Sequence, residues 1–397
     1  MKKTMILGVA VMTALTFASC SKDEVSNVNT NDVNAIGFDA STGKTRASVA
    51  DLSVVKGDNN GFGIYATNGA SAAQFINNQA YGFVSGTWTW LGPNVMWPTN
   101  STDYPVNFYA YFPKNSANLT NTLTSTYTVD ENPANQVDYL AANHTGVVVR
   151  PSSSNVTIGF KHILSKIDFK VVTDAQVTVE VQSIRVQHIG NTATFNFCSL
   201  SWTVAPSAFT SSPNYMKAPV VAANKFVGQT TPKAVTGASG SLMLMPQNLT
   251  SRAWNQTTIA DLATSNYIEV VYRVYETATG KDIVGFSDAT LHPDYATSGS
   301  TVTGPLFVKV GYVIPNNWDM SKAYTYTISL GTSNASGGNL INPDFIDKNG
   351  DDTNFKVIDP GTGTPIDVPG PVVDQNKPIG FVVSVEDWGT PNDTPLD

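Results

Sequence analysis

The sequence predicts an all-β fold arranged as two β-sandwich domains in tandem. Many short segments alternate apolar and polar side chains, which is the two-residue period of a half-buried strand. Gly, Pro, Asn and Asp separate these segments, and no long capped segment has the 3.6-residue period of a helix. At 397 residues and 41% hydrophobic content, the chain is long enough to form two or three cores.

The composition is typical of an exported β-rich protein. Charged residues make up 14% of the chain, well below the roughly 25% of ordinary soluble domains, whereas Thr, Ser, Asn and Gly are abundant. The net charge is −8 and no basic patch is visible, so we expect no nucleic-acid partner. No apolar run after Phe17 approaches 18 residues, so we expect no later membrane-spanning helix.

Residues 1–19 have the pattern of a lipoprotein signal peptide. Lys2 and Lys3 precede an apolar run over residues 5–17 that is too short to span a bilayer. Small residues then stand directly before Cys20, although Phe17 takes the place of the usual leucine of a lipobox. We expect cleavage before Cys20 and acylation of its thiol, because several acyl chains anchor a protein stably. The alternative is an ordinary signal peptide in which Cys20 is incidental.

Residues 20–46 contain a polar tract followed by a short alternating segment. Ile36, Phe38 and Ala40 would share one face of a strand, because side chains alternate with a period of two. Arg46 follows, just before Ala47, as a basic residue that a protease can recognise. The segment is either a strand that proteolysis removes or a flexible tether leading into the first strand of a domain. Composition alone favours the tether.

The remaining chain divides into an expected N-terminal sandwich, residues 47–173, and an expected C-terminal sandwich, residues 174–397. A small polar break at 173–176 marks the boundary. Strand patterns occur at 61–65, 81–91, 104–113, 137–142, 147–150, 156–172, 177–181, 183–188, 192–204, 240–245, 267–275 and 282–286. Residues 276–281 are expected to form a hairpin turn, and 206–236, which lack periodicity, a long loop.

A last strand is expected over residues 379–388. Its alternating apolar side chains are Ile379, Phe381, Val383 and Val385. This pattern suits a strand that inserts into a groove of another molecule and pairs along an open sheet edge. It suits equally a strand that completes its own C-terminal domain, and the residues leave both interpretations open.

No catalytic motif is visible, so we expect no enzyme, cofactor or metal site. The chain has no Gly-x-Ser-x-Gly elbow, His-Glu-x-x-His pair, phosphate-binding glycine loop or Cys-x-x-Cys pair. Residues 347–352 place oxygen donors at positions 1, 3 and 5 of a calcium loop. Asp352 and Ile358 stand where an EF-hand requires Gly and Glu, so a solvated acidic turn is expected instead.

The other chemically reactive side chains are expected to be structural. Cys198 is expected to be a small buried residue, and His162 a histidine with a local hydrogen-bond partner. Three tryptophans are candidates for a sugar-stacking surface, but we expect them to lie mostly in the core: Trp88, Trp90 and Trp97.

Three groups of residues resemble the fimbrillin family, the lipoprotein pilins of type V pili. The first is Cys20 with the following Lys-Asp-Glu, the Ile-x-Phe that starts at Ile36, and Thr-Arg-Ala around Arg46. The second is the aromatic, His and Leu-Ser-Lys-Ile-x-Phe run over residues 160–169. The third is the Trp and Tyr-x-Tyr-x-Ile-x-Leu pattern over residues 318–330.

The resemblance implies two transthyretin-like, Greek-key sandwiches and a role in assembly. Such a protein reaches the outer membrane as a lipoprotein, and an arginine-specific protease would cut it between Arg46 and Ala47. The strand lost would carry Ile36, Phe38 and Ala40, and a strand from another pilin subunit, here the segment at 379–388, would fill the groove. The resemblance implies a fimbrium on the cell surface and adhesion to a host or bacterial surface ligand.

Other functions remain open at this stage. One alternative is a tip or anchor subunit, because the resemblance does not distinguish these from a stalk subunit. The other alternative is a non-polymerising surface lipoprotein that binds glycan or protein ligands through residues 206–236 or through the tryptophans.

Overall fold

The computed structural model describes residues 34–42, 52–69, 73–114, 123–151, 155–204, 215–218, 225–235, 240–250, 265–284, 295–296, 305–314, 316–330, 338–340, 356–357 and 380–387. Across these ranges nearly every regular element is a strand, and the one α-helix among them is α1 (Leu52–Gly57). The all-β fold class is therefore confirmed. No helix in these ranges is long and apolar enough to cross a membrane.

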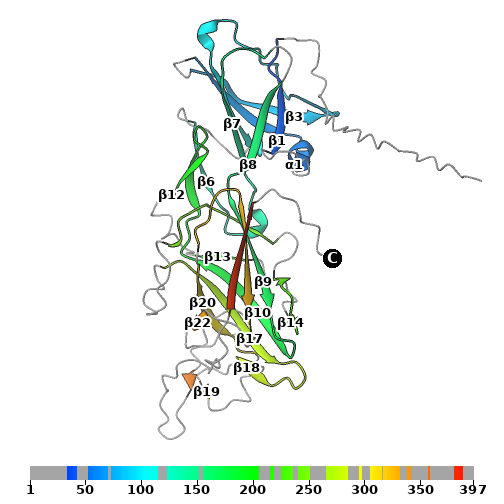
Figure 1. Cartoon of the computed structure of the whole chain (residues 1–397), viewed down its shortest axis with the longest axis vertical. Coiled ribbons are helices and arrows are strands. Elements are labelled where there is room, and N and C mark those ends of the chain that lie inside the picture. The colour runs from blue at the N-terminus through cyan, green and yellow to red at the C-terminus, as the bar shows by residue number, and fades with distance from the viewer. Residues whose placement is uncertain are drawn as a thin grey trace, which may run out of the picture.

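The N-terminal part is a seven-stranded sheet with the order β1-β8-β7-β5-β2-β3-β4 (Figure 1). Its strands are β1 (Phe38–Thr42), β2 (Phe62–Asn68), β3 (Ala73–Val84), β4 (Thr87–Trp90), β5 (Val106–Phe112), β7 (Leu140–Val147) and β8 (Val156–His162). β1 runs parallel to β8, and the other neighbours are antiparallel. Two 3-10 turns lie at Ser101–Asp103 and Pro133–Asn135.

The alternating side chains explain how this sheet encloses a core. On β8, Val156, Ile158, Phe160 and His162 are buried, whereas Thr157 and Lys161, which alternate with them, are exposed. The ends of the sheet also meet, because side chains of β1 contact those of β3 and β4 across the core. The first strand therefore closes the N-terminal core.

The C-terminal part has two sheets. One contains β13 (Tyr215–Lys217), β10 (Val177–Gln187), β17 (Tyr267–Glu276), β20 (Val308–Val313) and β22 (Gly338–Leu340), with β14 (Lys225–Val227) on β10 and β18 (Asp282–Val284) on β17. The other contains β15 (Lys233–Ala234), β9 (Ser165–Val172), β21 (Lys322–Ser329) and β24 (Gly380–Asp387), with β16 (Leu242–Leu244) on β9. A further pair is β19 (Tyr295–Ala296) with β23 (Lys356–Val357).

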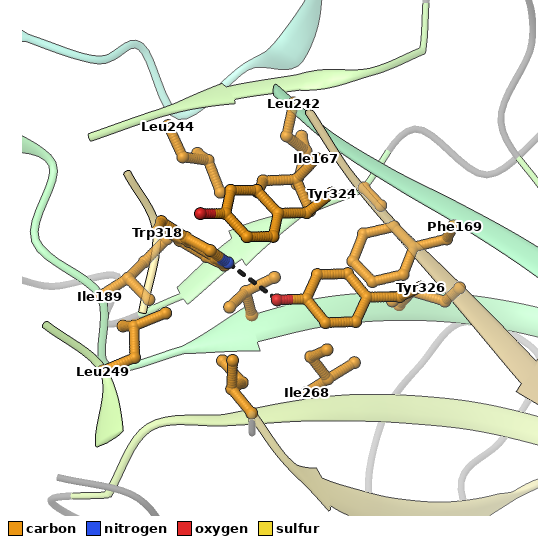
Figure 2. Packing of buried hydrophobic residues seen from close by; sticks show 14 of the residues in the cluster. Ile167, Phe169, Ile189, Leu242, Leu244, Leu249, Ile268, Trp318, Tyr324 and Tyr326 are labelled. Carbon is orange, nitrogen blue, oxygen red and sulfur yellow. Dashed lines mark hydrogen bonds between the residues drawn. The ribbon is translucent and has the colours of Figure 1, made fainter. Parts of the chain in front are cut away.

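The two C-terminal sheets share one core. Phe169 from β9 and Ile268 from β17 belong to the same buried cluster. Figure 2 shows Trp318 and Tyr326 within it, where the Trp318 indole Nε1 donates to the Tyr326 hydroxyl at 2.8 Å. A Trp or Tyr hydrogen-bonding group needs such a partner when it is buried. The run over residues 318–330 is therefore a structural part of the C-terminal core.

A three-stranded sheet joins the two parts. It consists of β12 (Ser201–Val204), β11 (Thr192–Asn196) and β6 (Thr124–Thr128), so a strand from the first half of the chain pairs with strands from the second. Figure 1 places β6 and β12 between the N-terminal and C-terminal sheets. Tyr111 of β5 packs its ring 6.2 Å from that of Phe197, just after β11. Side chains thus connect the N-terminal sheet to the C-terminal core.

The change from one part to the other occurs earlier than the boundary expected at 173–174. β8 pairs in the N-terminal sheet, whereas β9 pairs in parallel with β21 in the C-terminal part. The polar break at 173–176 instead joins β9 to β10, two strands of facing sheets. The sequence did not reveal this change between β8 and β9, because the partner strand of β9, β21, lies more than 150 residues later in the sequence.

Residues 206–236 are not one long loop in their described parts. β13 and β14 pair with β10, and β15 pairs with β9. These strands are only two or three residues long, so they leave almost no periodic signal in the sequence. The hairpin expected at 276–281 is present, with Gly280 at φ +71° and its N–H donating to the Glu276 carbonyl oxygen.

Candidate functional site

The first strand lies at the edge of the N-terminal sheet. β1 pairs with β8 from Phe38 opposite Val156 to Thr42 opposite Phe160. The preceding segment is held on its other side, because the Ile36 N–H donates to the Val95 carbonyl oxygen at 2.8 Å. Residues 34–42 therefore close the sheet with pairing on both sides.

Phe38 is the centre of an aromatic cluster. Its side chain is fully buried, and its ring packs edge-on against those of Tyr81, Trp90 and Phe108 at 5.1, 5.6 and 5.2 Å between centroids. Ile36 is also buried, and Ala40 packs against the same core. Edge-to-face contacts add stabilisation beyond the area that the rings bury. The three residues predicted to share one face of the first strand thus supply apolar side chains to the core.

Two polar side chains also bind the backbone of this strand. The Trp90 indole Nε1 donates to the Ile36 carbonyl oxygen at 2.8 Å, and the Phe38 N–H donates to the Tyr81 hydroxyl at 3.1 Å. Burial raises the pKa of Tyr81 to about 12, so its hydroxyl stays protonated and donates to the Trp88 carbonyl oxygen. Both groups lose these partners if residues 34–42 leave the sheet.

The outward face of the strand has a close contact at Gly37. A Cβ atom at this position would lie 2.1 Å from the Oδ1 atom of Asn155. The Asn155 amide Nδ2 in turn donates to an Asp39 carboxylate oxygen at 3.0 Å. Only a residue without a side chain fits at position 37 while Asn155 keeps this position.

The last strand lies at an edge of the C-terminal sheet. β24 pairs antiparallel with β21, from Gly380 opposite Ser329 to Asp387 opposite Lys322. Val383 is partly buried against the C-terminal core, but Val385 remains 50% exposed. An ion pair between Lys322 and Asp387, 2.5 Å apart, lies at the exposed end of this pairing. β24 is therefore fixed mainly by backbone pairing to one neighbour.

β1 and β24 differ in how deeply their described apolar side chains are buried. β1 contributes the fully buried Phe38, whereas β24 has an apolar residue half in solvent, Val385. An edge strand with exposed apolar positions can pair with a second molecule. The two ends of the chain thus present a filled groove and a strand of matching pattern.

Several predicted residues lie outside the described ranges. These are Cys20, Arg46, Ala47, Ile379 and the candidate calcium loop at 347–352. Phe381 is paired through its backbone with Ile328. No group of three or more His, Cys, Asp or Glu side chains suited to a metal ion occurs within the part of the chain that the structure describes.

Trp88, Trp90 and Trp97 do not form an exposed platform. Trp90 and Trp97 are buried, and Trp88 packs partly buried against the same N-terminal core. His162 is buried and its Nδ1 lies 2.8 Å from an Asp138 carboxylate oxygen, which fits a structural histidine.

Cys198 is exposed, and the expectation that it would be buried is wrong. It lies in the turn between β11 and β12, where Asn196 Oδ1 accepts a hydrogen bond from its N–H at 2.9 Å. Ala193, Phe195 and Phe197 are the buried positions of this alternation, and Cys198 is out of phase with them. Burial and the neighbouring Cys198 raise the pKa of Tyr109 to about 12.

A pocket beside the three-stranded sheet has no signal in the sequence. Its volume is about 360 Å³, and its lining includes Trp202, Asn248, Asn317, Asp319 and Met320. The walls come from three separate segments, residues 200–202, 246–248 and 317–320. The bridge between Gln247 and Trp318 and the β11–β12 hairpin bring them together. An indole beside amide and carboxylate groups can contact a small polar ligand.

These features define a class: an all-β protein whose first strand fills its own N-terminal core and whose last strand is an exposed edge. A family model described as fimbrillin-like matches residues 45–343, which is most of the chain. The chain therefore belongs to the fimbrillin-like family, as its sequence resemblance indicated.

One curated protein and one solved structure are similar to this chain. The fimbrium subunit Fim1C of Phocaeicola vulgatus is 27% identical over 203 residues, covering 43% of this chain and 52% of that protein. The match thus spans about half the length of the curated relative. The crystal structure of a fimbrial protein from Bacteroides vulgatus is 15% identical, with a TM-score of 0.56, and the alignment covers 89% of this chain and 99% of the other. This second similarity supports the fold.

Proposed function

We propose that the protein is a structural subunit of a cell-surface fimbria and serves adhesion. The observation that supports this most is the first strand: it fills the N-terminal core, yet only a short segment separates its end at Thr42 from Arg46. Family membership supports the same function. The role is assembly, and it requires no catalytic residue, cofactor or metal.

The precursor is exported as an outer-membrane lipoprotein acylated at Cys20. At the cell surface an arginine-specific protease cuts between Arg46 and Ala47, which releases residues 20–46 together with the lipid. The cut removes β1 from the N-terminal sandwich, because β1 ends at Thr42. Processing thus detaches the subunit from the membrane and opens its groove in one step.

Loss of β1 makes the N-terminal sandwich ready to polymerise. Burying Ile36 and Phe38 contributes about 1.5–3 kcal/mol for each side chain, and this is lost when they leave. The Trp90 indole and the Tyr81 hydroxyl lose their backbone partners. A groove that exposes apolar walls and an unpaired strand edge on β8 is stabilised by any strand of the right pattern.

The C-terminal strand of another subunit fills this groove. β24 carries the required alternation, and its exposed edge position makes its exchange less costly than that of a central strand. Each subunit then gives one strand and receives one, which builds a linear polymer. The seven-stranded N-terminal sheet acts as acceptor, and the C-terminal sheet that contains β24 as donor.

Replacing the cleavage residue tests this function. In cells that express Arg46→Ala, we expect the full-length lipoprotein to accumulate and the amount of fimbriae on the surface to fall at least tenfold. A substitution of the nearby Lys44 by Ala serves as the control and should leave assembly unchanged. Normal fimbriae from Arg46→Ala, counted by electron microscopy, would contradict activation by cleavage at this residue.

A second candidate function is a non-polymerising surface lipoprotein that binds glycan or protein ligands. The pocket beside Trp202 favours it, because an indole face and the amides of Asn248 and Asn317 suit the hydroxyl groups of a sugar. The buried Trp90 and Trp97 do not contribute to such binding. The two functions differ in the mature chain, since a permanently anchored lipoprotein keeps Cys20 and β1.

A further inference from the structure

The last strand and the first strand have similar sequences. Residues 36–42 read Ile-Gly-Phe-Asp-Ala-Ser-Thr, and residues 379–385 read Ile-Gly-Phe-Val-Val-Ser-Val. The two are identical at the first, second, third and sixth positions. Ile-Gly-Phe occurs also at 158–160, but that segment is part of β8 and lies between β1 and β7 in the sheet. Among these three, the first and last lie on edge strands.

We propose that residues 379–385 of a second copy occupy the positions of residues 36–42, in the same direction and the same register. The inference rests on the proposed strand exchange and specifies how the two copies fit. It places Phe381 of the second copy in the site of Phe38, Gly380 in the site of Gly37 and Ile379 in the site of Ile36.

The walls of the groove explain why these three residue types recur. The Phe38 site is lined by the rings of Tyr81, Trp90 and Phe108, which suit another phenylalanine. At position 37, on the outward face of the strand, Asn155 leaves room only for a glycine. A Cβ atom at this position would lie 2.1 Å from the Asn155 Oδ1 atom. A shift by one residue would turn the apolar side chains away from the core. A shift by two would place Phe381 outside the aromatic cluster.

The direction follows from the order of the residues. Ile, Gly and Phe occupy their three sites in the same sequence order only if the incoming strand runs parallel to β8, as β1 does. The backbone then offers a carbonyl oxygen at the Ile position to the Trp90 indole, and an N–H at the Phe position to the Tyr81 hydroxyl.

The register also extends the pairing beyond the end of β1. Since Phe38 lies opposite Val156, Phe381 of the second copy would do the same, and Glu386 would then lie opposite Lys161. Lys161 is exposed on the outward face, and Glu386 falls on that face by alternation. Opposite charges on neighbouring strands favour this register. Three positions differ: Val382 stands in the place of Asp39, Val383 in that of Ala40 and Val385 in that of Thr42. The first of these removes the carboxylate that Asn155 contacts.

Disulfide trapping between copies tests the register. Thr157 lies opposite Asp39 in the structure, so the proposal places Val382 of the second copy opposite Thr157. Neighbouring strands lie about 4.8 Å apart, within the reach of a disulfide. Within one chain Val382 instead pairs with Thr327 of β21. The exposed Cys198 is replaced by Ser in the parent of every variant.

The variant Thr157→Cys with Val382→Cys is compared with Thr157→Cys with Ser384→Cys, which moves the partner two residues along the strand. The second pair would be separated by about 8 Å, too far for a disulfide without backbone movement. Full-length variants are expressed in cells, and surface fimbriae are separated by denaturing electrophoresis without reductant. We expect a ladder of covalent multimers from the first pair, reduced at least tenfold in the second.

Each other outcome is informative. A ladder from the second pair alone would overturn the register and leave strand exchange intact. No ladder from either pair, in fimbriae that the Cys198→Ser parent forms normally, would overturn the placement of residues 379–385 in the groove. A parent that forms no fimbriae, with an unaltered wild-type chain that also forms none, would contradict the proposed function itself.

Discussion

At the scale of single residues, Phe38 connects the sequence pattern to the packing. It is fully buried among three aromatic rings, although it belongs to an edge strand near the beginning of the chain. A side chain that served only as the end of a tether would not need this environment. Its burial makes the first strand costly to remove, and in the proposed assembly it lets the groove select a replacement strand.

Phe38→Ala tests the contribution of this side chain. We expect the precursor to lose about 3–5 kcal/mol of its free energy of unfolding, the range for phenylalanine removed from a packed core. Denaturant unfolding of the purified full-length chain measures it. Val84→Ala, at a side chain that is 47% exposed, is the control and should cost less than about 0.5 kcal/mol.

The comparison with processed protein sharpens this test. After cleavage at Arg46 the substituted residue is no longer in the chain, so the stability of the mature subunit should not change. Equal stability of the wild-type and Phe38→Ala precursors would show that β1 does not support the N-terminal core.

At the scale of elements, charges on the C-terminal sheet link three neighbouring strands. Glu180 on β10 lies opposite Lys225 of β14 and Arg273 of β17. Its carboxylate oxygens are 2.5 Å from Lys225 Nζ and 2.6 Å from Arg273 Nε. Burial raises the pKa of Glu180, but the hydrogen bonds and charges of Arg273 and Lys225 outweigh it, so the net pKa lies below its usual value.

This arrangement predicts a loss of stability in acid. A carboxyl whose pKa is lower in the folded state contributes stability that is fully present above its unfolded pKa of about 4.5 and lost as pH falls through the lower, folded value. Glu180→Gln should therefore cost about 3 kcal/mol at pH 7, because it removes the carboxylate that is paired with the buried Arg273. The difference from wild type should shrink below pH 4.

Denaturant unfolding at pH 7 and at pH 3.5 measures both effects. Glu131→Gln, at an exposed carboxyl, is the control and should match wild type at both values. If Glu180→Gln were as much less stable than wild type at pH 3.5 as at pH 7, the ionised carboxylate would not be the source of the stabilisation.

The strands themselves were largely predictable from the sequence. Alternation identifies β8 and β21 because each has one face in a core and period two is the direct result. β5 and β17 are buried on both faces along most of their length, so mostly apolar runs mark them in the sequence. The same rule indicated that Ile36 and Phe38 would share a buried face, and both are buried. The fold class follows from these elements without any knowledge of their pairing.

At the scale of the whole molecule, what the sequence did not predict depends on distant partners. β9 pairs with β21, and β6 pairs with β11, so the two parts of the chain begin and end at places that no local pattern marks. The pocket beside Trp202 and the exposure of Cys198 arise from the same long-range pairing and from a turn. Local periodicity carries no information on such contacts.

The arrangement of the two ends gives the molecule its proposed function. Figure 1 shows β1 in the N-terminal part and β24 in the C-terminal part, with the three-stranded sheet between them. In the proposed assembly the acceptor and the donor lie in different parts of one chain, so each subunit can give a strand to one neighbour and receive a strand from another. Cleavage after Arg46 is therefore the step on which the proposed assembly depends.

The mass of the mature subunit tests that step most directly. Protein is taken from intact surface fimbriae, and mass spectrometry identifies its first residue. We predict that the chain begins at Ala47 and lacks residues 34–42. A mature surface chain that begins at a lipidated Cys20 would contradict stalk assembly by removal of β1, and would favour an anchor subunit or a monomeric ligand-binding lipoprotein.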